Sequence, residues 1–363
     1  FWLKFGSGSH LASGLGDAFC PRGCRGRSRS GGCRSGRDAL NLVTREAAME
    51  GALAGGLVEC RLESAHDLAA LISALQLREK DQKDQRVYCE ASSRGLKFCT
   101  QSFGKDVAVL GWMFQTAFKE YRFTGEDKEV HLKLPVAPLL SCLQIFSDRA
   151  ALVLRYPSGP SDELRFTLEE EGAVTECCLK TLVLDEAPTP VGSFFGPGES
   201  ITVLRPALPE TWYQALSEFS ELEAPDVVLR VTIRAGDAAS TAAMVLRAQT
   251  FATVSGDAEV ELPRTAFEEV TLSPDAQRAG EVTHSYLLTS VLSSCMRAAK
   301  DAKAVKVRFN QAGQMSNQFI LRSRGQQDLF CESLVSPLAE VGGSFVPGST
   351  LTQGAAARDS VGF

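Results

Sequence analysis

The chain has 363 residues, of which 44% are hydrophobic and 23% charged, and its formal net charge is −6 at pH 7. This length predicts two domains, each large enough to bury its own core, and the apolar runs are shorter than the roughly 18 residues that a membrane helix needs. The first 50 residues are basic, so the rest of the chain is acidic, which argues against a protein that holds nucleic acid by bulk positive charge.

Residues 1–56 form a basic, low-complexity segment that we expect to be disordered, because its Gly, Ser and Arg residues offer little to bury. Either Met49 is the true or an alternative start, or the segment is an organelle transit sequence. Its three cysteines are irregularly spaced and have a single histidine to complete a site, so we predict no zinc there. The chain holds 11 cysteines, an odd number scattered in apolar patterns, which favours buried, reduced thiols in the cytosol or nucleus over a disulfide framework.

The pattern of residues 57–184 predicts, in chain order, a strand, a helix, several strands, a second helix and three strands. The first strand covers 57–63 and the first helix 64–80, where Ser64 and Asp67 occupy capping positions. The expected buried faces are Leu68, Leu71, Ile72 and Leu75 in the first helix, and Leu139, Leu140, Leu143 and Phe146 in the second. The last two strands meet at a Glu-Gly pair that is typical of a hairpin turn.

Residues 201–338 repeat the same order. The third helix follows Pro209, which suits the first turn of a helix, and the fourth helix covers 285–303. Their expected buried faces are Trp212, Leu216 and Phe219 in the third helix, and Leu288, Val291, Leu292 and Cys295 in the fourth. Residues 185–200, rich in Pro and Gly, read as an interdomain connector, and residues 339–363 as a C-terminal tail that we expect to be disordered.

A Ser-Cys pair recurs in the second and fourth helices, at Cys142 and Cys295, and each helix leads into a similar strand, ALVLRY or AVKVRF. The two halves therefore look like a tandem duplication. Each half predicts an α+β domain in which a predominantly antiparallel sheet packs against two helices. Because all the helices of two such domains can lie on one side, the pattern suggests a segment of a ring.

Five stretches carry a family resemblance: LAALISALQLRE, FGKDVAVLGWMFQTAFKEYRF, HLKLPVAPLLSCLQIF, LRFTLEEEGAVTECCLKT and QALSEFSEL. They resemble a DNA sliding clamp, the fold of proliferating cell nuclear antigen, and more closely the Rad-one subunit of the checkpoint clamp, the nine-one-one heterotrimer. LEEEGAVTECCLKT is the most specific stretch, since the fold in general does not require acids before a Gly turn and a Thr-x-Cys strand after it. The resemblance covers residues 57–338, and within 240–285 it is one of pattern only.

The resemblance implies tandem sliding-clamp domains, at 57–184 and 201–338, with antiparallel sheets and two helices per domain lining a central hole. It implies a non-catalytic subunit that joins two related clamp subunits edge to edge, in a ring around double-stranded DNA of any sequence. An ATP-dependent clamp loader would place this ring on DNA in the nucleus. Repair enzymes and checkpoint kinase activators would bind it there, in DNA damage sensing and DNA repair. The alternatives are a homotrimeric replication processivity clamp and, from a different class of protein, a 3′–5′ exonuclease.

In a clamp the helices face the DNA, so basic residues on them would contact phosphates, which position a protein without reading sequence. The six candidates lie at the end of the first helix and on the fourth: Arg78, Lys80, Lys83, Arg297, Lys300 and Lys303. The alternative is a solvated helix face, because nearby acids dilute both groups. The third helix is itself acidic, with Glu210, Glu218 and Glu221. Phe194 and Phe195 in the connector are candidates for docking partner peptides, and the alternative is that they anchor the connector to a sheet.

No catalytic group of residues is readable in this sequence. Glu169, Glu170 and Glu171 lie in the expected hairpin, where neighbouring side chains alternate between faces and cannot converge on a metal. The four histidines are widely separated, and no Gly-rich loop carries the Lys-Ser/Thr of a phosphate-binding loop. We therefore predict that the chain is not an enzyme and has no catalytic residue, metal or cofactor.

Overall fold

The computed structural model of this protein contains two repeats of one α+β domain. The described residues are 57–77, 85–125, 129–157, 163–184, 200–222, 224–236, 242–250, 258–324, 328–341 and 344–347. All of them lie in the compact unit Leu53–Phe363. The N-terminal segment 1–56 and nearly all of the predicted connector lie outside the described residues. No helix in the described part of the chain is long and apolar enough to cross a membrane.

The first repeat runs in the order strand, helix, five strands, helix, three strands. Its elements are β1 (Val58–Leu62), α2 (Ala65–Ala74), β2 (Arg86–Ser92), β3 (Gly95–Gln101), β4 (Val107–Phe114), the 3₁₀ helix η2 (Gln115–Ala117), β5 (Glu120–Phe123), β6 (Val130–Pro135), α3 (Val136–Leu143), β7 (Ala151–Tyr156), β8 (Glu163–Glu170) and β9 (Ala173–Lys180). The turn between β8 and β9 is the predicted Glu-Gly pair, and both of its residues have positive φ, 49° at Glu171 and 85° at Gly172.

The second repeat has the same order. Its elements are β10 (Thr202–Pro206), α4 (Pro209–Ser217), η4 (Ser220–Leu222), β11 (Val227–Arg234), β12 (Ala242–Thr250), β13 (Ala258–Pro263), η5 (Arg264–Ala266), β14 (Phe267–Thr271), α5 (Pro274–Ala279), β15 (Glu281–Leu287), α6 (Leu288–Asp301), β16 (Ala302–Phe309), β17 (Met315–Leu321) and β18 (Leu329–Val335). The short helix α5 has no counterpart in the described part of the first repeat. Where we expected a disordered tail, β19 (Leu338–Val341) and β20 (Ser344–Pro347) pair as a further hairpin.

The strands form three larger sheets, and their order repeats between the two halves. The first sheet is β5-β1-β7-β8-β9, the second is β14-β10-β16-β17-β18-β4-β3-β2-β6, and the third is β13-β12-β11-β15. The order β14-β10-β16-β17-β18 copies β5-β1-β7-β8-β9, and β13-β12-β11-β15 copies β4-β3-β2-β6. The nine-stranded sheet therefore arises where β18 of the second repeat pairs with β4 of the first. The predicted α+β duplication is confirmed.

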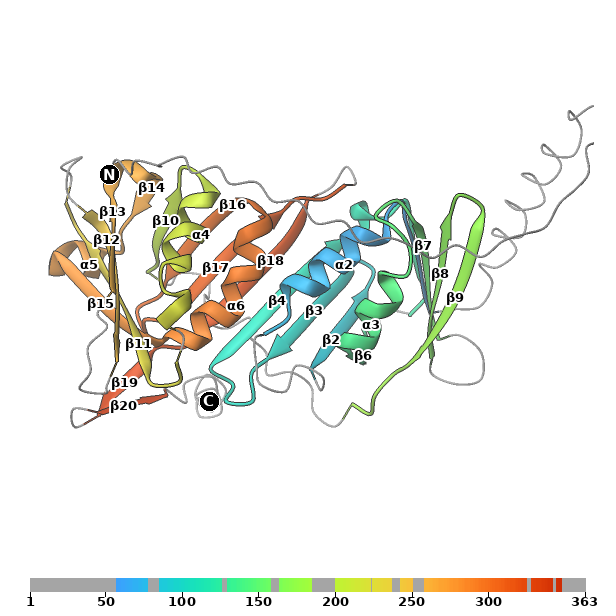
Figure 1. Cartoon of the computed structure of the whole chain (residues 1–363), viewed down its shortest axis with the longest axis horizontal. Helices are drawn as coiled ribbons and strands as arrows, with labels where there is room; N and C mark the ends of the chain where they lie inside the picture. The colour runs from blue at the N-terminus through green and yellow to red at the C-terminus, as the bar shows by residue number, and fades with distance from the viewer. Residues whose placement is uncertain are drawn as a thin grey trace, which may run out of the picture. The chain divides into compact units, whose positions relative to one another are not determined.

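Helices α2, α4 and α6 cover one face of the nine-stranded sheet (Figure 1). Helix α4 packs on β10 and β16, α6 packs on β16, β17, β18 and β4, and α2 reaches across to β18. Helix α3 packs on β6 and β9 at the other end of the first repeat. The predicted helix faces are buried, apart from Phe146, which is partly buried. Apolar residues at helical spacing therefore hold all four helices against the sheets.

Two predicted helices start or end differently in the structure. The first helix ends at Ala74, with Leu75 as its C-cap, rather than continuing to 80. The fourth begins at Leu288 rather than 285, because the residues before it form β15, which pairs with β11 along its whole length. Tyr286 on β15 is fully buried, and its hydroxyl donates a hydrogen bond of 2.5 Å to the carbonyl of Gly313. The strand ends at Leu287 and the helix begins at Leu288, so no turn residue marks the change from strand to helix in the sequence.

The Ser-Cys pairs of the two repeats are one residue out of register. The four buried residues of α3 are Val136, Leu139, Leu140 and Leu143. In α6 the residues with the same spacing from the helix start, all fully buried, are Leu288, Val291, Leu292 and Cys295. Cys142 therefore corresponds to Ser294, and Leu143 corresponds to Cys295. The pairing of Cys142 with Cys295 from the sequence alone was wrong by one position.

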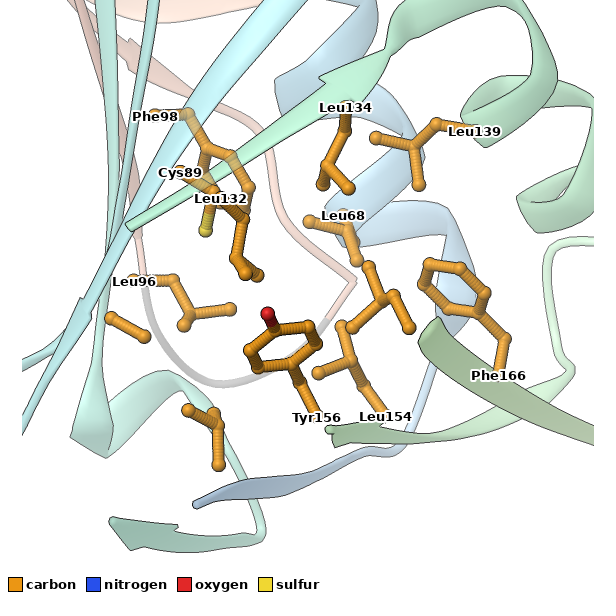
Figure 2. Close-up of a pocket in the computed structure, with 13 residues that line it drawn as sticks. Leu68, Cys89, Leu96, Phe98, Leu132, Leu134, Leu139, Leu154, Tyr156 and Phe166 are labelled. Carbon is orange, nitrogen blue, oxygen red and sulfur yellow. The ribbon is translucent and has the colours of Figure 1, made fainter. Parts of the chain in front are cut away.

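The core of the first repeat contains a small apolar cavity, which Figure 2 shows, with the hydroxyl of Tyr156 pointing into it. Its volume is about 20 Å³, and Leu68 and Ala91 are among its lining residues. The second repeat carries larger side chains at the corresponding positions. Trp212 is the fourth residue of α4, as Leu68 is of α2, and Ile233 pairs with β15 and β12 as Ala91 pairs with β6 and β3. Smaller side chains at these positions explain the cavity.

We expect the Ala91→Val substitution to stabilise the protein, because two added methyl groups would fill the cavity without displacing a neighbour. The free energy of unfolding, measured by urea denaturation, should rise by about 0.5–2 kcal/mol. Ala248→Val is the control, since Ala248 is also fully buried in a strand but does not line this cavity. That variant should lose about 1–3 kcal/mol through overpacking. An equal loss in both variants would contradict the prediction.

Candidate nucleic-acid interface and strand edges

The structure places three of the six predicted DNA-facing residues near the end of α6. Arg297 and Lys300 lie on the helix, whereas Lys303 lies on β16, because the helix ends at Asp301. The stripe of three on one helix was therefore wrong for Lys303. The other three candidates, Arg78, Lys80 and Lys83, fall outside the described residues, as do Phe194 and Phe195.

The three described cations differ in how freely they could meet a phosphate. The guanidinium of Arg297 donates a hydrogen bond to Oε1 of Gln76, which follows α2, so this partly buried side chain links the two repeats. The ammonium group of Lys303 forms an ion pair with Asp328. Lys300 is exposed and makes no ion pair with a residue in the described ranges. Among the three, Lys300 is the most available for an anion.

The helices that the structure describes carry little positive charge. Arg297 and Lys300 are the only Lys or Arg residues in α2, α3, α4 and α6. Helix α4 presents exposed Glu210, which forms an ion pair of 3.5 Å with Arg322 after β17. Arg324, two residues further on, pairs with Asp148. The sequence did not predict these two arginines as part of the helix face, because only the tertiary fold brings the β17–β18 turn beside the helices.

The acidic hairpin spreads its carboxylates. Glu169 belongs to the ladder between Ala151 and Val174, whereas the carboxylate of Glu170 accepts a hydrogen bond of 3.0 Å from the backbone N–H of Ser147. Glu171 occupies the turn itself. Among the described residues no three His, Cys, Asp or Glu side chains gather as metal ligands. Nothing in this part of the molecule resembles the converging carboxylates of a metal-dependent nuclease.

The junction between the repeats is an antiparallel pairing of β18 with β4 that runs from Phe330↔Trp112 to Val335↔Val107. On the face away from the helices it carries a cluster of apolar side chains, which we call the outer-face cluster. Its residues are Tyr88, Cys99, Ala108, Leu110, Trp112, Phe330 and Leu334. The rings of Trp112 and Phe330 lie 5.3 Å apart across the junction. Apolar packing on the outer face therefore adds to the backbone ladder.

The other face of the junction lies beneath α2. A Cβ atom at Gly111 would lie 2.9 Å from Cδ1 of Leu71, so only glycine lets the helix approach this closely. The predicted strand VAVLGWMF is apolar on both faces, which is typical of a strand buried on both sides. This run was the available sequence signal for the junction and its outer-face cluster.

Hydrogen bonds to one aspartate stabilise the helix side of the junction. The carboxylate of Asp106 accepts hydrogen bonds from the hydroxyls of Ser102, at 2.6 Å, and Ser290 on α6, at 2.7 Å. Its backbone carbonyl accepts from the N–H of Ser336, just after β18, at 2.8 Å. Asp106 therefore joins the β3–β4 turn of the first repeat to two elements of the second.

The residues just before the connector contact strand β6. Leu182 bridges Lys133 of β6, and the N–H of Leu182 donates a hydrogen bond of 2.8 Å to the Lys133 carbonyl. Strand β6 lies beside β2, which supplies Tyr88 to the outer-face cluster. The chain thus enters the connector along the edge of the sheet that carries this cluster.

Two edge strands correspond to β18 and β4 of the junction, but each of them has a neighbouring strand on one side only within the described ranges. Strand β9 occupies the place of β18, and β13 that of β4. Among the described residues β9 pairs with β8 alone and β13 with β12 alone. Val174 on β9 is 57% exposed, and Glu259 and Glu261 on β13 are exposed. Open edges of this kind present unpaired backbone N–H and C=O groups to another strand.

Comparison with known proteins gives a family and a fold. A family model described as "Repair protein Rad1/Rec1/Rad17" matches residues 57–321. The crystal structure of the PCNA2–PCNA3 complex from Sulfolobus tokodaii is similar, with a TM-score of 0.57 and 14% sequence identity. The match covers 77% of this chain and 98% of that one, and at this identity it shows the sliding-clamp fold alone. No curated protein sequence matches this chain.

We expect Asp106→Ala to lower the free energy of unfolding by about 1–3 kcal/mol, because it leaves partly buried hydroxyls without their acceptor. Asp148→Ala is the matched control: it removes the exposed ion pair with Arg324 and should cost at most about 1 kcal/mol. Urea denaturation of both variants makes the comparison. Equal losses would mean that the Asp106 hydrogen bonds do not stabilise the junction.

Proposed function

Since this chain belongs to the Rad1/Rec1/Rad17 family of repair proteins and has the sliding-clamp fold, we propose that it acts as one subunit of a heterotrimeric ring around double-stranded DNA. Clamp subunits of this family are non-catalytic scaffolds, in line with the prediction that the chain is not an enzyme. Its function therefore rests on the surfaces with which it binds its neighbours and DNA.

The observation that carries the proposal is the internal β18–β4 junction. It joins one repeat to the next by antiparallel strand pairing, and the same two kinds of edge, β9 and β13, stand open at the ends of the tandem. A related subunit with the same repeats would offer a β4-like edge to β9 and a β18-like edge to β13. Repetition of one junction then closes a ring.

The charges on these edges support unlike neighbours over copies of this chain. Following the pairings across the sheets, Glu176 corresponds to Glu332 and Glu259 corresponds to Leu110. Because Glu332 pairs with Leu110 in the internal junction, two copies of this chain would set Glu176 directly opposite Glu259. Like charges at directly opposite positions destabilise a strand pair. The homotrimeric processivity clamp is therefore the weaker alternative.

The internal junction also shows how a buried acid is tolerated there. Glu332 is 8% exposed, and its carboxylate accepts hydrogen bonds from Arg308, at 2.5 Å, and from Ser316, at 2.5 Å. Opposite it stands an apolar residue, Leu110. A related subunit with an apolar or basic residue opposite Glu176 would therefore pair with β9 better than a second copy of this chain would. The same holds for a residue opposite Glu259 on β13.

The helix face would line the hole of the ring. Among its described cations Lys300 is the most available, with Arg297 and Lys303 close by, and the low positive charge of the described helices is compatible with a protein that encirclement keeps on DNA. An ATP-dependent clamp loader would open the ring and place it, and the loaded ring would serve repair enzymes and checkpoint kinase activators in the nucleus. Short peptides of such partners would dock on the outer-face cluster beside the connector, where Phe194 and Phe195 lie in sequence.

The ring proposal makes a prediction about molar mass. The purified chain should be a monomer of 39.1 kDa by light scattering, and it should enter a ring only when two related clamp subunits are co-expressed. Glu176→Lys should raise self-association by about 2- to 10-fold, because it replaces the like-charge contact with an attractive one.

Glu169→Lys is the control for this substitution. It makes the same charge change in the same hairpin, but β8 is paired on both sides, so self-association should not change. A wild-type chain that forms a trimer of about 117 kDa by itself would overturn the heterotrimer in favour of the processivity clamp.

The DNA-facing assignment is tested in the assembled ring. We expect Lys300→Gln with Lys303→Gln to weaken binding to double-stranded DNA about 3- to 10-fold, and to lower the slope of log affinity against log salt by about 1–2. Arg297 is left unchanged, because its side chain also holds Gln76. Lys306→Gln is the control, since Lys306 points away from the helices on the same strand β16. An effect of the same size in the control would show that the lost charge acts without facing DNA.

A further inference from the structure

The second repeat contains a pair of hydrogen-bonded serines where α6 meets β18. The hydroxyl of Ser333 on β18 donates to Oγ of Ser294 on α6 over 2.8 Å. Both side chains are buried, with exposed fractions of 0% and 1%. This contact ties the helix to the strand that makes the internal junction.

The first repeat carries two cysteines at the corresponding positions. Cys142 on α3 corresponds to Ser294, as shown above. Cys177 on β9 corresponds to Ser333 on β18, because Cys177 pairs with Phe166 as Ser333 pairs with the equivalent residue of β17, Asn317. Helix α3 packs on β9, and the two thiols lie close enough that, besides burial, Cys177 raises the pKa of the Cys142 thiol. Both side chains are partly buried and both cysteines are free. A serine pair that could only hydrogen bond is thus replaced by a thiol pair that could also form a covalent bond.

We propose that Cys142 and Cys177 are a site of reversible oxidation, where a peroxide converts the two thiols into a disulfide between α3 and β9. One thiol gives its electron pair to a peroxide oxygen, which leaves a sulfenic acid and one water or alcohol. The second thiol attacks this sulfur, an S–S bond forms, and a second water leaves. Two thiols lose two protons and two electrons, and the peroxide O–O bond is reduced. A dithiol reductant reverses the reaction.

The surroundings of the pair determine how fast and how selectively it reacts. Burial and the neighbouring Cys177 raise the pKa of the Cys142 thiol to about 11, so little of it is thiolate at neutral pH. Oxidation should therefore be slow at pH 7 and faster as pH rises. Other described thiols are worse placed: Cys60 and Cys89 are buried at 3% and 4% exposure in the core. Cys178 is exposed but points to the opposite face of β9 from Cys177.

The position of the pair gives the disulfide a consequence that rests on the proposed ring. Strand β9 is an open edge that would join a related subunit, and α3 would line the hole. A covalent bond between them would fix the edge strand on its own helix and slow its local opening. Oxidation would then change how readily the chain exchanges between rings, although the backbone groups of β9 that would pair stay the same.

The test uses the full chain, treated with hydrogen peroxide, alkylated and analysed by mass spectrometry. The expected product is a monomer that has lost two hydrogen atoms, about 2 Da, with the peptides of Cys142 and Cys177 cross-linked. It should form at least about tenfold faster at pH 9 than at pH 7 and revert with dithiothreitol. Cys142→Ser and Cys177→Ser should each abolish it, and both should fold, because the second repeat carries serine at both positions.

Cys178→Ser is the matched control, one residue away on the exposed face, and should form the same product at a rate within about twofold. Three results would overturn the proposal: a disulfide-linked dimer through Cys178 as the main product, sulfinic or sulfonic acid on separate cysteines without a cross-link, or a cross-link that survives in Cys177→Ser. Mixing the oxidised and the reduced chain with two related clamp subunits separates the two claims. If even the reduced chain does not assemble with these subunits, the proposed ring is contradicted, while the result for the disulfide remains valid.

Discussion

The pairing of β18 with β4 is the interaction on which the other features of this molecule depend. Its backbone ladder merges a sheet from each repeat into nine strands, and it fixes α2 and α6 on the same face. Gly111 lets α2 approach the ladder, Asp106 fastens its helix side, and the outer-face cluster covers its other side. The equivalents of the two joined strands, β9 and β13, pair on one side only among the strands that the structure describes.

On the described helix face, the basic side chains make structural contacts more often than they stand free. Arg297 contacts Gln76, Arg322 contacts Glu210 and Lys303 contacts Asp328, so three of its described basic groups also stabilise the structure. The described part of this surface therefore offers few free cations to attract DNA. A closed ring has no need of tight attraction, since it leaves DNA only when a junction opens. The strength of the strand edges, rather than the number of cations, would then set how long the protein stays on DNA.

Periodicity predicted what depends on burial along the chain: the four helix faces, the duplication and the Glu-Gly turn. It failed where tertiary contacts decide. Strand β15 was missed because its mixed sequence EVTHSYL runs directly into α6, and Lys303 was placed on the helix because α6 in turn runs directly into β16. Arg322 lies beside the helix face only because of the tertiary fold. Cys142 was matched with Cys295 because both follow a serine, whereas the buried positions of the two helices align Cys142 with Ser294. The pairing of strand edges was not readable from one sequence.

The unlike edges of this chain have a consequence for assembly. The edge strand β9 of the first repeat carries an exposed valine and an exposed glutamate. The edge strand β13 of the second repeat carries two exposed glutamates. A neighbour that suits one edge is therefore the wrong neighbour for the other. In the proposed ring the three subunits would therefore follow one another in a single cyclic order. The two flat sides of the ring, one facing each way along the DNA, would then differ in composition at every junction. Any protein that approaches along DNA would meet a different surface from each direction.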